Sequence, residues 1–389
     1  MSAHSITGAS APAAADVYKL LGVRRVINAA DTYTALGGGR LPAEVTSAMV
    51  DAAAHHVHVD ELLPAVGRRI AELLDVPAAL VVNGAAAGLT VAAAGCIAGT
   101  DPARVGHLPQ CPGDRNQVVT LKCQRNPYDR ALLTAGAELV EVGYADSTPE
   151  WSLESAIGPR TAAVVYYAGN QFEQYALPLE RVAELAAAQS VPLVVDAAAQ
   201  LPPVANLWDY LRRGADLVLF SGGKGLRGPQ SSGLVVGRQD LVEACAANSY
   251  PHHSVARAMK TSKENILGLL AAVERAVALD WDVEYTRWQG LLQRYAAQLT
   301  AIPEVHAWEV PTGRLGQTCP RLFFEWTGPH TGTAGELGAA LAARDPSILI
   351  GIERPRDRQA YLNPYSILRD EEDHLIDVVV EEVKVVVNS

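Results

Sequence analysis

The sequence predicts an α/β protein with a large domain built on a mainly parallel sheet and a smaller α+β C-terminal domain. Three observations lead to this prediction. Short apolar runs recur along the first two thirds of the chain, alanine-rich stretches with helical spacing separate them, and the pattern changes after Pro251. Strands that alternate with helices over so many units form parallel sheets that helices cover on both faces.

Seven apolar runs are interpreted as strands. Each run is short, rich in valine and free of regular apolar–polar alternation, which is typical of a strand buried on both faces. In chain order the runs span residues 79–82, 117–121, 139–142, 162–167, 191–195, 217–220 and 234–236.

Helical patterns lie between and after these runs. Residues 85–98 and 179–189 have helical spacing, and residues 264–279 and 285–299 resemble long amphipathic helices. A weaker mixture of strands and helices follows from Val305 onward. We therefore expect three parts, namely a disordered tail over residues 1–17, an N-terminal arm and large domain over 18–255, and a small domain over 256–389.

Composition and charge exclude several classes of protein. The chain has 389 residues, of which 49% are hydrophobic, so it is too apolar to be disordered. Its net charge of −11 argues against a non-specific nucleic-acid binder. No run reaches the ~18 consecutive apolar residues of a membrane span, and the N-terminus lacks the pattern of a signal peptide. Five scattered cysteines without a CxxC pair favour a reducing, cytoplasmic setting and indicate no metal site.

A lysine follows the run at residues 217–220, in the segment Ser221-Gly222-Gly223-Lys224-Gly225-Leu226-Arg227-Gly228-Pro229-Gln230. Lysine is seldom buried without a partner, and the neighbouring glycines let the backbone approach a ligand closely. Such a lysine is suited to act as a nucleophile that forms a Schiff base. The alternative interpretation is a surface turn with an incidental lysine.

Two other strand ends carry groups that bind ligands. Asp196 follows the run at residues 191–195, at the carboxyl end where open α/β sheets hold their ligands, and its carboxylate can pair with a pyridinium nitrogen. The segment Asn83-Gly84-Ala85-Ala86-Ala87-Gly88 joins a strand to a helix, and free N–H groups at a helix start suit a phosphate. A helix cap at Asp196 and an ordinary tight turn at residues 83–88 are the alternatives.

Further short motifs surround these three segments. They are Val26-Ile27-Asn28-Ala29, Leu36-Gly37-Gly38-Gly39, Asp196-Ala197-Ala198-Ala199-Gln200-Leu201-Pro202-Pro203, Asn206-Leu207-Trp208, Gly214-Ala215-Asp216-Leu217-Val218, and Met259-Lys260 with Lys263-Glu264. With the phosphate turn, the strand-end aspartate and the lysine segment in this order, the chain resembles fold-type I pyridoxal-phosphate enzymes, which have the aspartate aminotransferase-like fold. Within them it resembles the family of L-seryl-tRNA(Sec) selenium transferase and D-glucosaminate-6-phosphate ammonia-lyase, over roughly residues 18–280.

The resemblance implies a cofactor and a set of residues that hold it. Lys224 would bind pyridoxal 5'-phosphate covalently, and Asp196 would pair with its ring nitrogen, so these two are the expected catalytic residues. Active sites of this family lie at a dimer interface, so a homodimer or a larger even-numbered homo-oligomer is expected. The other expected cofactor contacts, made by backbone groups, a hydroxyl and side-chain amides, come from Gly84, Ala85, Ala86, Ser221, Gln200 and Gln124.

One position departs from the family. In Lys122-Cys123-Gln124-Arg125-Asn126 the family usually has histidine where this chain has Gln124. Glutamine stacks poorly on a ring and does not titrate, so either another group covers the cofactor or the reaction differs. Lys122 and Arg125 remain as cations for substrate contact, with solvated surface charges as the alternative. Arg369 is a further candidate, because a guanidinium binds carboxylates with two hydrogen bonds.

The expected reaction takes place at Cα of a small amino acid. Lys224, once freed, would remove the Cα proton, and a β-hydroxyl would then leave, which releases a keto acid and ammonia. This lyase chemistry has a racemase, epimerase or transferase as its alternative, and a catalytically inactive cofactor-binding relative as an alternative of another class. The expected partner is a small molecule and not a nucleic acid or a membrane. The family's tRNA-binding N-terminal domain has no counterpart before Val26.

Overall fold

The computed structural model describes residues 16–111, 115–327 and 332–388. Backbone contacts divide the chain into two compact units. The large unit contains Thr32–Arg287 and Pro311–Pro320. The small unit contains Met1–Asp31, Trp288–Val310 and Arg321–Ser389.

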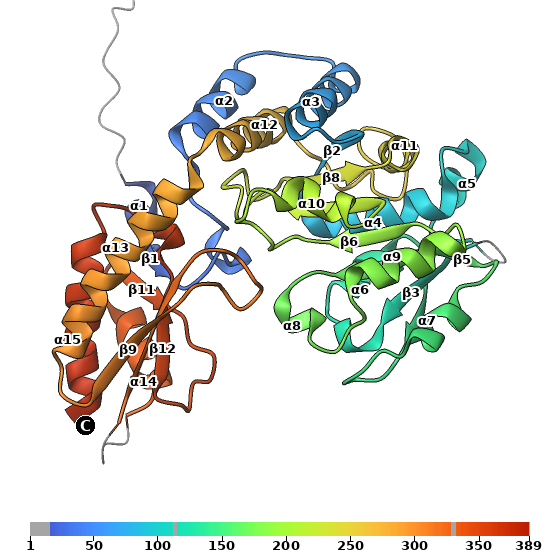
Figure 1. Ribbon diagram of the computed structural model, residues 1–389. Coiled ribbons are helices and arrows are strands. Elements are labelled where there is room, and N and C mark those ends of the chain that lie inside the picture. The colour runs from blue at the N-terminus through green and yellow to red at the C-terminus, as the bar shows by residue number, and fades with distance from the viewer. Residues whose placement is uncertain (1–15, 112–114, 328–331, 389) are drawn as a thin grey trace, which may run out of the picture. The chain divides into compact units, whose positions relative to one another are not determined.

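A seven-stranded sheet forms the centre of the large unit, with strand order β2-β8-β7-β6-β5-β3-β4 (Figure 1). Strands β7, β6, β5, β3 and β4 run parallel to one another, whereas β8 is antiparallel to both of its neighbours. The expected mainly parallel sheet is therefore confirmed. The strands are β2 (Ala78–Val82), β3 (Gln117–Leu121), β4 (Glu138–Val142), β5 (Thr161–Tyr167), β6 (Leu193–Asp196), β7 (Leu217–Ser221) and β8 (Gly233–Gly237).

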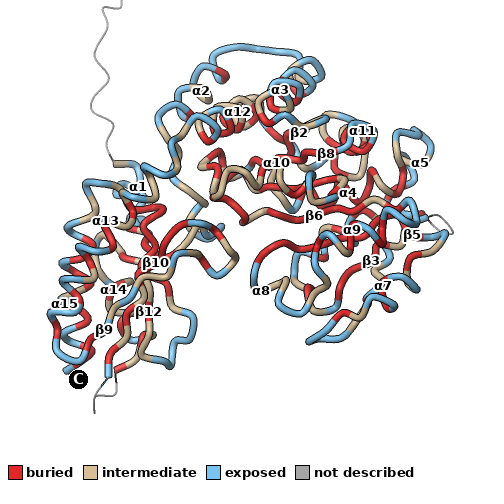
Figure 2. Tube along the Cα trace, in the orientation of Figure 1, coloured by how far each residue is buried: buried red, intermediate tan, exposed pale blue. Residues whose placement is uncertain are grey.

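The central strands are buried on both faces, which explains their continuous apolar runs. Every residue of β5, β6 and β8 is buried, and Figure 2 shows these strands in red. Each of the seven expected runs overlaps one strand of the sheet. The largest difference is at β6, which begins at Leu193 and not at Val191. Pro192 lies between the two and has no N–H group for the ladder.

Helices cover both faces of this sheet. Alternate residues of the strands pack into two separate apolar clusters, one with α4, α6 and α11 and the other with α3, α7, α9, α10 and α12. The helices of the large unit are α2 (Ala43–Ala53), α3 (Val59–Leu74), α4 (Gly84–Ala98), α5 (Pro102–His107), α6 (Asp129–Thr134), α7 (Glu150–Ala156), α8 (Asn170–Glu173), α9 (Leu179–Ala188), α10 (Asn206–Arg212), α11 (Gln239–Ala247) and α12 (Lys263–Ala278), with short 3-10 turns η1 (Thr34–Leu36) and η2 (Lys122–Gln124).

The small unit has an antiparallel three-stranded sheet, β12-β10-β9, and a parallel pair, β1-β11. Helices and strands share one apolar cluster here, so the expected α+β character is confirmed. The elements are α1 (Val17–Leu20), β1 (Val26–Ala29), α13 (Trp281–Thr300, which begins in the large unit), β9 (Val305–Val310), β10 (Arg321–Trp326), α14 (Ala334–Ala343), β11 (Ser347–Ile350), β12 (Gln359–Leu362), η3 (Pro364–Ser366) and α15 (Glu372–Asn388).

The contacts do not divide the chain at the boundary expected between residues 255 and 256. Helix α12 packs on α2 and α3 and so belongs to the large unit. The described residues that precede the large unit join the small unit because β1 pairs with β11. Of the tail expected over residues 1–17, residues 1–15 lie outside the described residues, and α1 begins at Val17. None of the helices in the described ranges is long and apolar enough to cross a membrane.

Candidate functional site

The carboxyl ends of three neighbouring parallel strands bring the candidate residues together. Strand β5 ends at Tyr167, β6 at Asp196 and β7 at Ser221. Tyr167 pairs with Asp196 in the ladder, and Asp196 pairs with Leu219, two residues before the end of β7. Asp196 therefore lies at the same edge of the sheet as the start of the lysine segment.

The phosphate turn reaches this edge through the antiparallel strand β8. Ser221 and Val82 both pair with Gly233, so the three residues form a row across β7, β8 and β2. Two strand spacings separate Ser221 from Val82, about 10 Å. The start of α4, directly after Val82, and the Ser221 hydroxyl therefore lie within reach of one small ligand.

Glycines fix the backbone on either side of Lys224. A Cβ at Gly222 would collide with Ser232 Oγ, and one at Gly225 would collide with the Leu201 carbonyl. The segment is also closed by backbone hydrogen bonds, since Gly222 N–H donates to Ser232 O at 2.9 Å and Gly228 N–H donates to Gly222 O at 2.8 Å. The lysine thus projects from a tightly packed turn, which is not the loose surface turn considered as the alternative.

The ammonium group of Lys224 makes no hydrogen bond or ion pair within the described ranges. Its side chain is half-buried. It is close enough to Asp196 for its positive charge to lower the pKa of that carboxyl group. The amine therefore has no hydrogen-bonding or ionic partner in the described residues, and it lies near a buried carboxylate.

Asp196 is 9% exposed and accepts the Ala198 N–H at 2.9 Å through Oδ1. Burial raises the pKa of this carboxyl group, and the Ala198 N–H and the charge of Lys224 act in the opposite direction. No helix begins after Asp196, because the next helix, α10, starts at Asn206. The helix-cap interpretation is therefore wrong, and the carboxylate ends a buried strand at a turn.

The first turn of α4 offers backbone groups for an anion. No side chain caps this end of the helix, so its first N–H groups lack the partners that a cap would give. Gly84 has a φ of +86°, and a Cβ there would meet nothing within 4 Å. Ala85 is half-buried and Ala86 is exposed. The helix start therefore faces open space with the positive end of its dipole.

Gln124 has a structural role that sequence reasoning missed. Its Nε2 donates to the Tyr167 carbonyl at 3.1 Å, and its Oε1 accepts the Tyr167 N–H at 3.0 Å. The side chain is 1% exposed. Since both ends of the amide are bound to the end of β5, Gln124 extends the sheet there. Its expected contact with the cofactor stays a prediction.

Gln200 is also buried, and its Nε2 donates to the Ala168 carbonyl at 3.1 Å. This bond ties the turn after β6 to the end of β5. Gln200 therefore lies at the strand-end edge, and its expected contact with the cofactor ring stays a prediction.

The two cations beside Gln124 have different surroundings. Arg125 forms ion pairs with Asp129 and Glu141, and the bond to Asp129 is the main reason for its raised pKa. A substrate carboxylate would compete with these two carboxylates, and the expected substrate contact of Arg125 stays a prediction. Lys122 is exposed and stays a candidate. Arg369 is exposed in the small unit, and its role stays a prediction as well.

A second segment that the sequence did not indicate lies at the same edge. Residues Pro311–Pro320 connect β9 to β10 but belong to the large unit by their contacts. Leu315 O accepts the Asn170 N–H at 3.4 Å, and the Thr318 N–H donates to Pro202 O at 3.0 Å. The only local signal for this segment is its pair of glycines, and such a signal does not reveal a distant partner.

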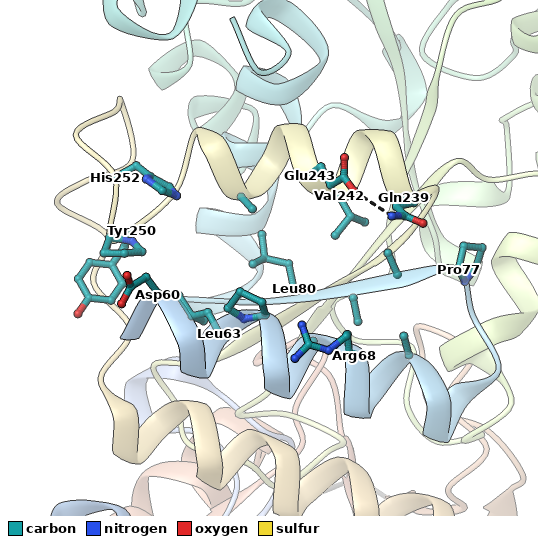
Figure 3. A pocket seen from close by; sticks show the side chains of 17 residues that line it. Asp60, Leu63, Arg68, Pro77, Leu80, Gln239, Val242, Glu243, Tyr250 and His252 are labelled. Carbon is teal, nitrogen blue, oxygen red and sulfur yellow. Dashed lines mark hydrogen bonds between the residues drawn. The ribbon is translucent and has the colours of Figure 1, made fainter. Parts of the chain in front are cut away.

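A cavity of about 550 Å³ occurs elsewhere in the large unit, between α3, α11 and the edge strand β2 (Figure 3). Apolar residues such as Leu63, Leu80 and Val242 line it together with Arg68 and Glu243. None of the residues expected to hold a cofactor or substrate is among its lining residues. Within the described ranges, no group of three or more His, Cys, Asp or Glu residues is placed to hold a metal ion.

Comparisons with known proteins show which family the chain is similar to. A family model described as SelA, L-seryl-tRNA selenium transferase, matches residues 128–299. The 5'-C-glycyluridine monooxygenase-decarboxylase of a Streptomyces species is 35% identical over 368 residues, which cover 92% of this chain and 90% of that protein. The D-glucosaminate-6-phosphate ammonia lyase of Salmonella typhimurium is 35% identical over 264 residues, which cover 67% of this chain and 69% of that protein.

A solved structure extends the similarity to the whole fold. The structure of a D-glucosaminate-6-phosphate ammonia-lyase superposes with a TM-score of 0.84 at 28% sequence identity and covers 96% of this chain and 99% of the other. The likeness therefore includes both compact units and is not confined to the segment around the lysine.

Proposed function

Because the chain belongs to the family of the L-seryl-tRNA selenium transferases and the D-glucosaminate-6-phosphate ammonia-lyases, we propose that it is a pyridoxal 5'-phosphate-dependent lyase acting at Cα of a small amino acid. The preferred reaction is α,β-elimination from a β-hydroxy amino acid. One observation supports this proposal most strongly. The Lys224 amine, which has no hydrogen-bonding or ionic partner in the described residues, lies near the buried carboxylate of Asp196 at the sheet edge where α4 begins.

The residues present fit the cofactor at three points. The start of α4 and the Ser221 hydroxyl suit its phosphate, and the Lys224 amine suits its aldehyde. Asp196 suits its ring nitrogen, because one carboxylate oxygen is bound to Ala198 and no other hydrogen bond to this carboxylate occurs within the described chain. When bound, pyridoxal phosphate supplies an electron sink for a bond broken at Cα.

Asp196 and Lys224 have separate tasks in this proposal. The buried carboxylate of Asp196 holds a proton at the ring nitrogen, and the low dielectric around it strengthens that charge pair. Lys224 Nζ takes the proton from Cα and returns it to the departing β-hydroxyl oxygen, so that water leaves. The released enamine takes up water, and the net products are a keto acid and ammonia.

Alternative reactions use the same proton transfer at Cα. A racemase or epimerase would return the proton to the opposite face and release nothing. Oxidative decarboxylation is a second candidate, because the relative named as a monooxygenase-decarboxylase is similar over 92% of this chain. An inactive cofactor-binding relative is the candidate of another class, and the intact Lys224 and Asp196 argue against it.

Replacing the lysine tests cofactor attachment. We expect the purified wild type to show the visible absorbance band of lysine-bound pyridoxal phosphate and to retain the cofactor after borohydride reduction. Lys224→Ala should lose both properties and reduce activity by about 10²- to 10⁴-fold, as expected when a general base is removed. Lys384→Ala, at an exposed lysine in α15, is the control and should behave as wild type. A Lys224→Ala variant that keeps the band would remove the proposal.

Product analysis distinguishes the reactions. A panel of β-hydroxy amino acids is incubated with the enzyme in heavy water, with ammonia, keto acid, carbon dioxide and oxygen followed together. Elimination releases ammonia and keto acid without consuming oxygen. Deuterium at Cα without ammonia would replace the lyase by a racemase, and oxygen uptake with carbon dioxide release would replace it by the decarboxylase.

The proposal includes a homo-oligomer and a cytoplasmic location. Active sites at a dimer interface are expected from the family resemblance, and several apolar side chains at residues 17–23 are more than half exposed, as on a surface that another chain covers. All five cysteines are free thiols, which supports a reducing compartment. The net charge of −11 supports a small-molecule substrate over a nucleic acid.

A further inference from the structure

The segment Pro311–Pro320 lies beside the candidate site although its neighbours in sequence belong to the small unit. It is hydrogen-bonded to Asn170 and Pro202, which follow β5 and β6. These strands end at Tyr167 and Asp196. The segment therefore lies at the strand ends, a few residues from the carboxylate proposed to hold the cofactor.

A tight turn forms the tip of this segment. Gly313 N–H donates to Gln317 O at 2.8 Å, and Gly316 N–H donates to Gly313 O at 2.9 Å. Gly316 has a φ of +95°, and a Cβ there would lie 2.9 Å from Asn170 Oδ1. Only glycine permits this backbone and this close approach. The backbone of the turn that carries Arg314 is thereby held next to Asn170.

Two polar side chains of the turn have no partner in the described chain. Arg314 is exposed and forms no ion pair or hydrogen bond. Gln317 is 7% exposed, and its buried Oε1 accepts no hydrogen bond. A buried acceptor without a donor costs free energy, so its presence in a packed turn points to a ligand that supplies the donor.

The chemistry of this pair matches an amino-acid substrate. A guanidinium recognises a carboxylate with two parallel hydrogen bonds, and a carboxamide oxygen accepts from a hydroxyl or amine. Arg125, near the same strand ends, is by contrast already neutralised by Asp129 and Glu141.

We propose that Arg314 binds the α-carboxylate of the substrate and so selects amino acids over the corresponding amines. The inference rests on the proposed function, because it assumes an amino-acid substrate at the strand-end site. It assigns the carboxylate to the β9–β10 connection and not to Arg369, and it makes residues 313–317 a specificity element.

The test compares binding of matched ligands to the cofactor-loaded protein. Dissociation constants are measured for a β-hydroxy amino acid and for the amine that lacks only its carboxylate, by the change in cofactor absorbance. Arg314→Gln should lower the preference for the amino acid by about 10- to 100-fold, the range expected for a lost charge-assisted hydrogen bond pair, and leave the affinity for the amine unchanged. Arg314→Lys should restore part of the preference, because it keeps the charge without the planar fork.

A control and a competing variant make the result specific. Arg68→Gln replaces an exposed arginine on α3 that lines the separate cavity, and it should keep the wild-type preference. Unchanged preference in Arg314→Gln would overturn the inference, as would a loss seen in Arg369→Gln alone. A second pair of ligands, with and without a distal phosphate, completes the test, since loss of phosphate preference in place of carboxylate preference would also overturn it.

The outcomes separate this inference from the proposed function. If the wild type shows the cofactor band and Arg314→Gln binds both ligands as wild type does, only the inference fails. If the wild type takes up no cofactor, the proposed function fails and the inference with it. Thermal unfolding of each variant confirms folding, and Arg314→Gln loses no hydrogen bond or ion pair within the described residues.

Discussion

At the scale of single residues, Asp196 lies where its proposed function and the stability of the protein conflict. A carboxylate at the end of a buried strand is desolvated, and this burial raises its pKa. The single hydrogen bond from Ala198 and the charge of Lys224 offset only part of that cost. A bound pyridinium group would supply a charge partner for this carboxylate and so offset the cost of its burial.

The first prediction at this scale concerns pH and stability. For the cofactor-free protein, Asp196→Asn should be more stable than wild type at neutral pH, because the ionised carboxylate is disfavoured in the folded state. A raised folded-state pKa means that wild type loses stability as pH rises from about 4, the unfolded value, to the folded pKa, and is constant above it.

Chemical unfolding of both proteins measures this difference in stability. The pH range begins at about 3.5, just below the unfolded pKa of ~4, and ends at neutrality. The gap should close at the acid end, where both side chains are neutral. The same variant should bind pyridoxal phosphate more weakly, because an amide cannot hold the charge of the ring nitrogen. A variant less stable than wild type at neutral pH would contradict this account of Asp196.

At the scale of elements, the turn after β7 holds Lys224 in place because its glycines leave no room for other side chains. Gly222 and Gly225 pack against Ser232 and Leu201, so neither position has room for a Cβ. The turn is joined to β8 through the Gly222–Ser232 hydrogen bond, and β8 is joined to β2, from which the phosphate turn starts. Lys224 and the start of α4 are therefore connected through the same edge of the sheet.

A glycine substitution tests this packing. Gly225→Ala should destabilise the protein by about 1–3 kcal/mol, because the new methyl group meets the Leu201 backbone, which cannot rotate away. It should also reduce covalent attachment of the cofactor at Lys224. Urea unfolding and the cofactor absorbance measure the two effects.

The matched control substitution should have the opposite effect on the stability of the protein. Gly290 lies within the long helix α13, and a Cβ there meets nothing within 4 Å. Gly290→Ala should therefore stabilise the helix by about 0.5–1 kcal/mol. If both substitutions were neutral, the glycines around Lys224 would have no packing role.

At the scale of the whole molecule, the chain leaves apolar surface near its N-terminus. Val17, Leu20 and Leu21 are 59%, 73% and 71% exposed, in a segment with five apolar residues between positions 17 and 23. Contiguous exposed apolar surface is typical of a site where another molecule binds. The family resemblance makes a second copy the proposed partner.

Light scattering of the purified protein should give twice the mass of one chain, or a larger even multiple. Leu20→Glu combined with Leu21→Glu should shift the population toward smaller species, because a buried apolar contact becomes charged. Lys19→Glu, at a neighbouring residue, is the control for charge alone. A monomeric wild type at micromolar concentration would exclude the oligomer.

The sequence by itself determined where the strands of the large sheet lie, and it singled out Lys224 and Asp196 as candidate site residues. These carry local signals, namely continuous apolar runs, glycines around a lysine and a charge that ends an apolar strand, and each is readable within about ten residues. The order of the segments then indicated the family, which the comparisons bear out.

Only the tertiary structure decided where distant segments meet. The amide of Gln124 completes the end of β5 at Tyr167, 43 residues away in sequence. The β9–β10 connection reaches Asn170 and Pro202 from more than a hundred residues along the chain, and β1 finds its partner in β11. Such contacts leave no periodic trace in the sequence, because a hydrogen bond between segments depends on where the whole chain folds and not on the residues next to either partner.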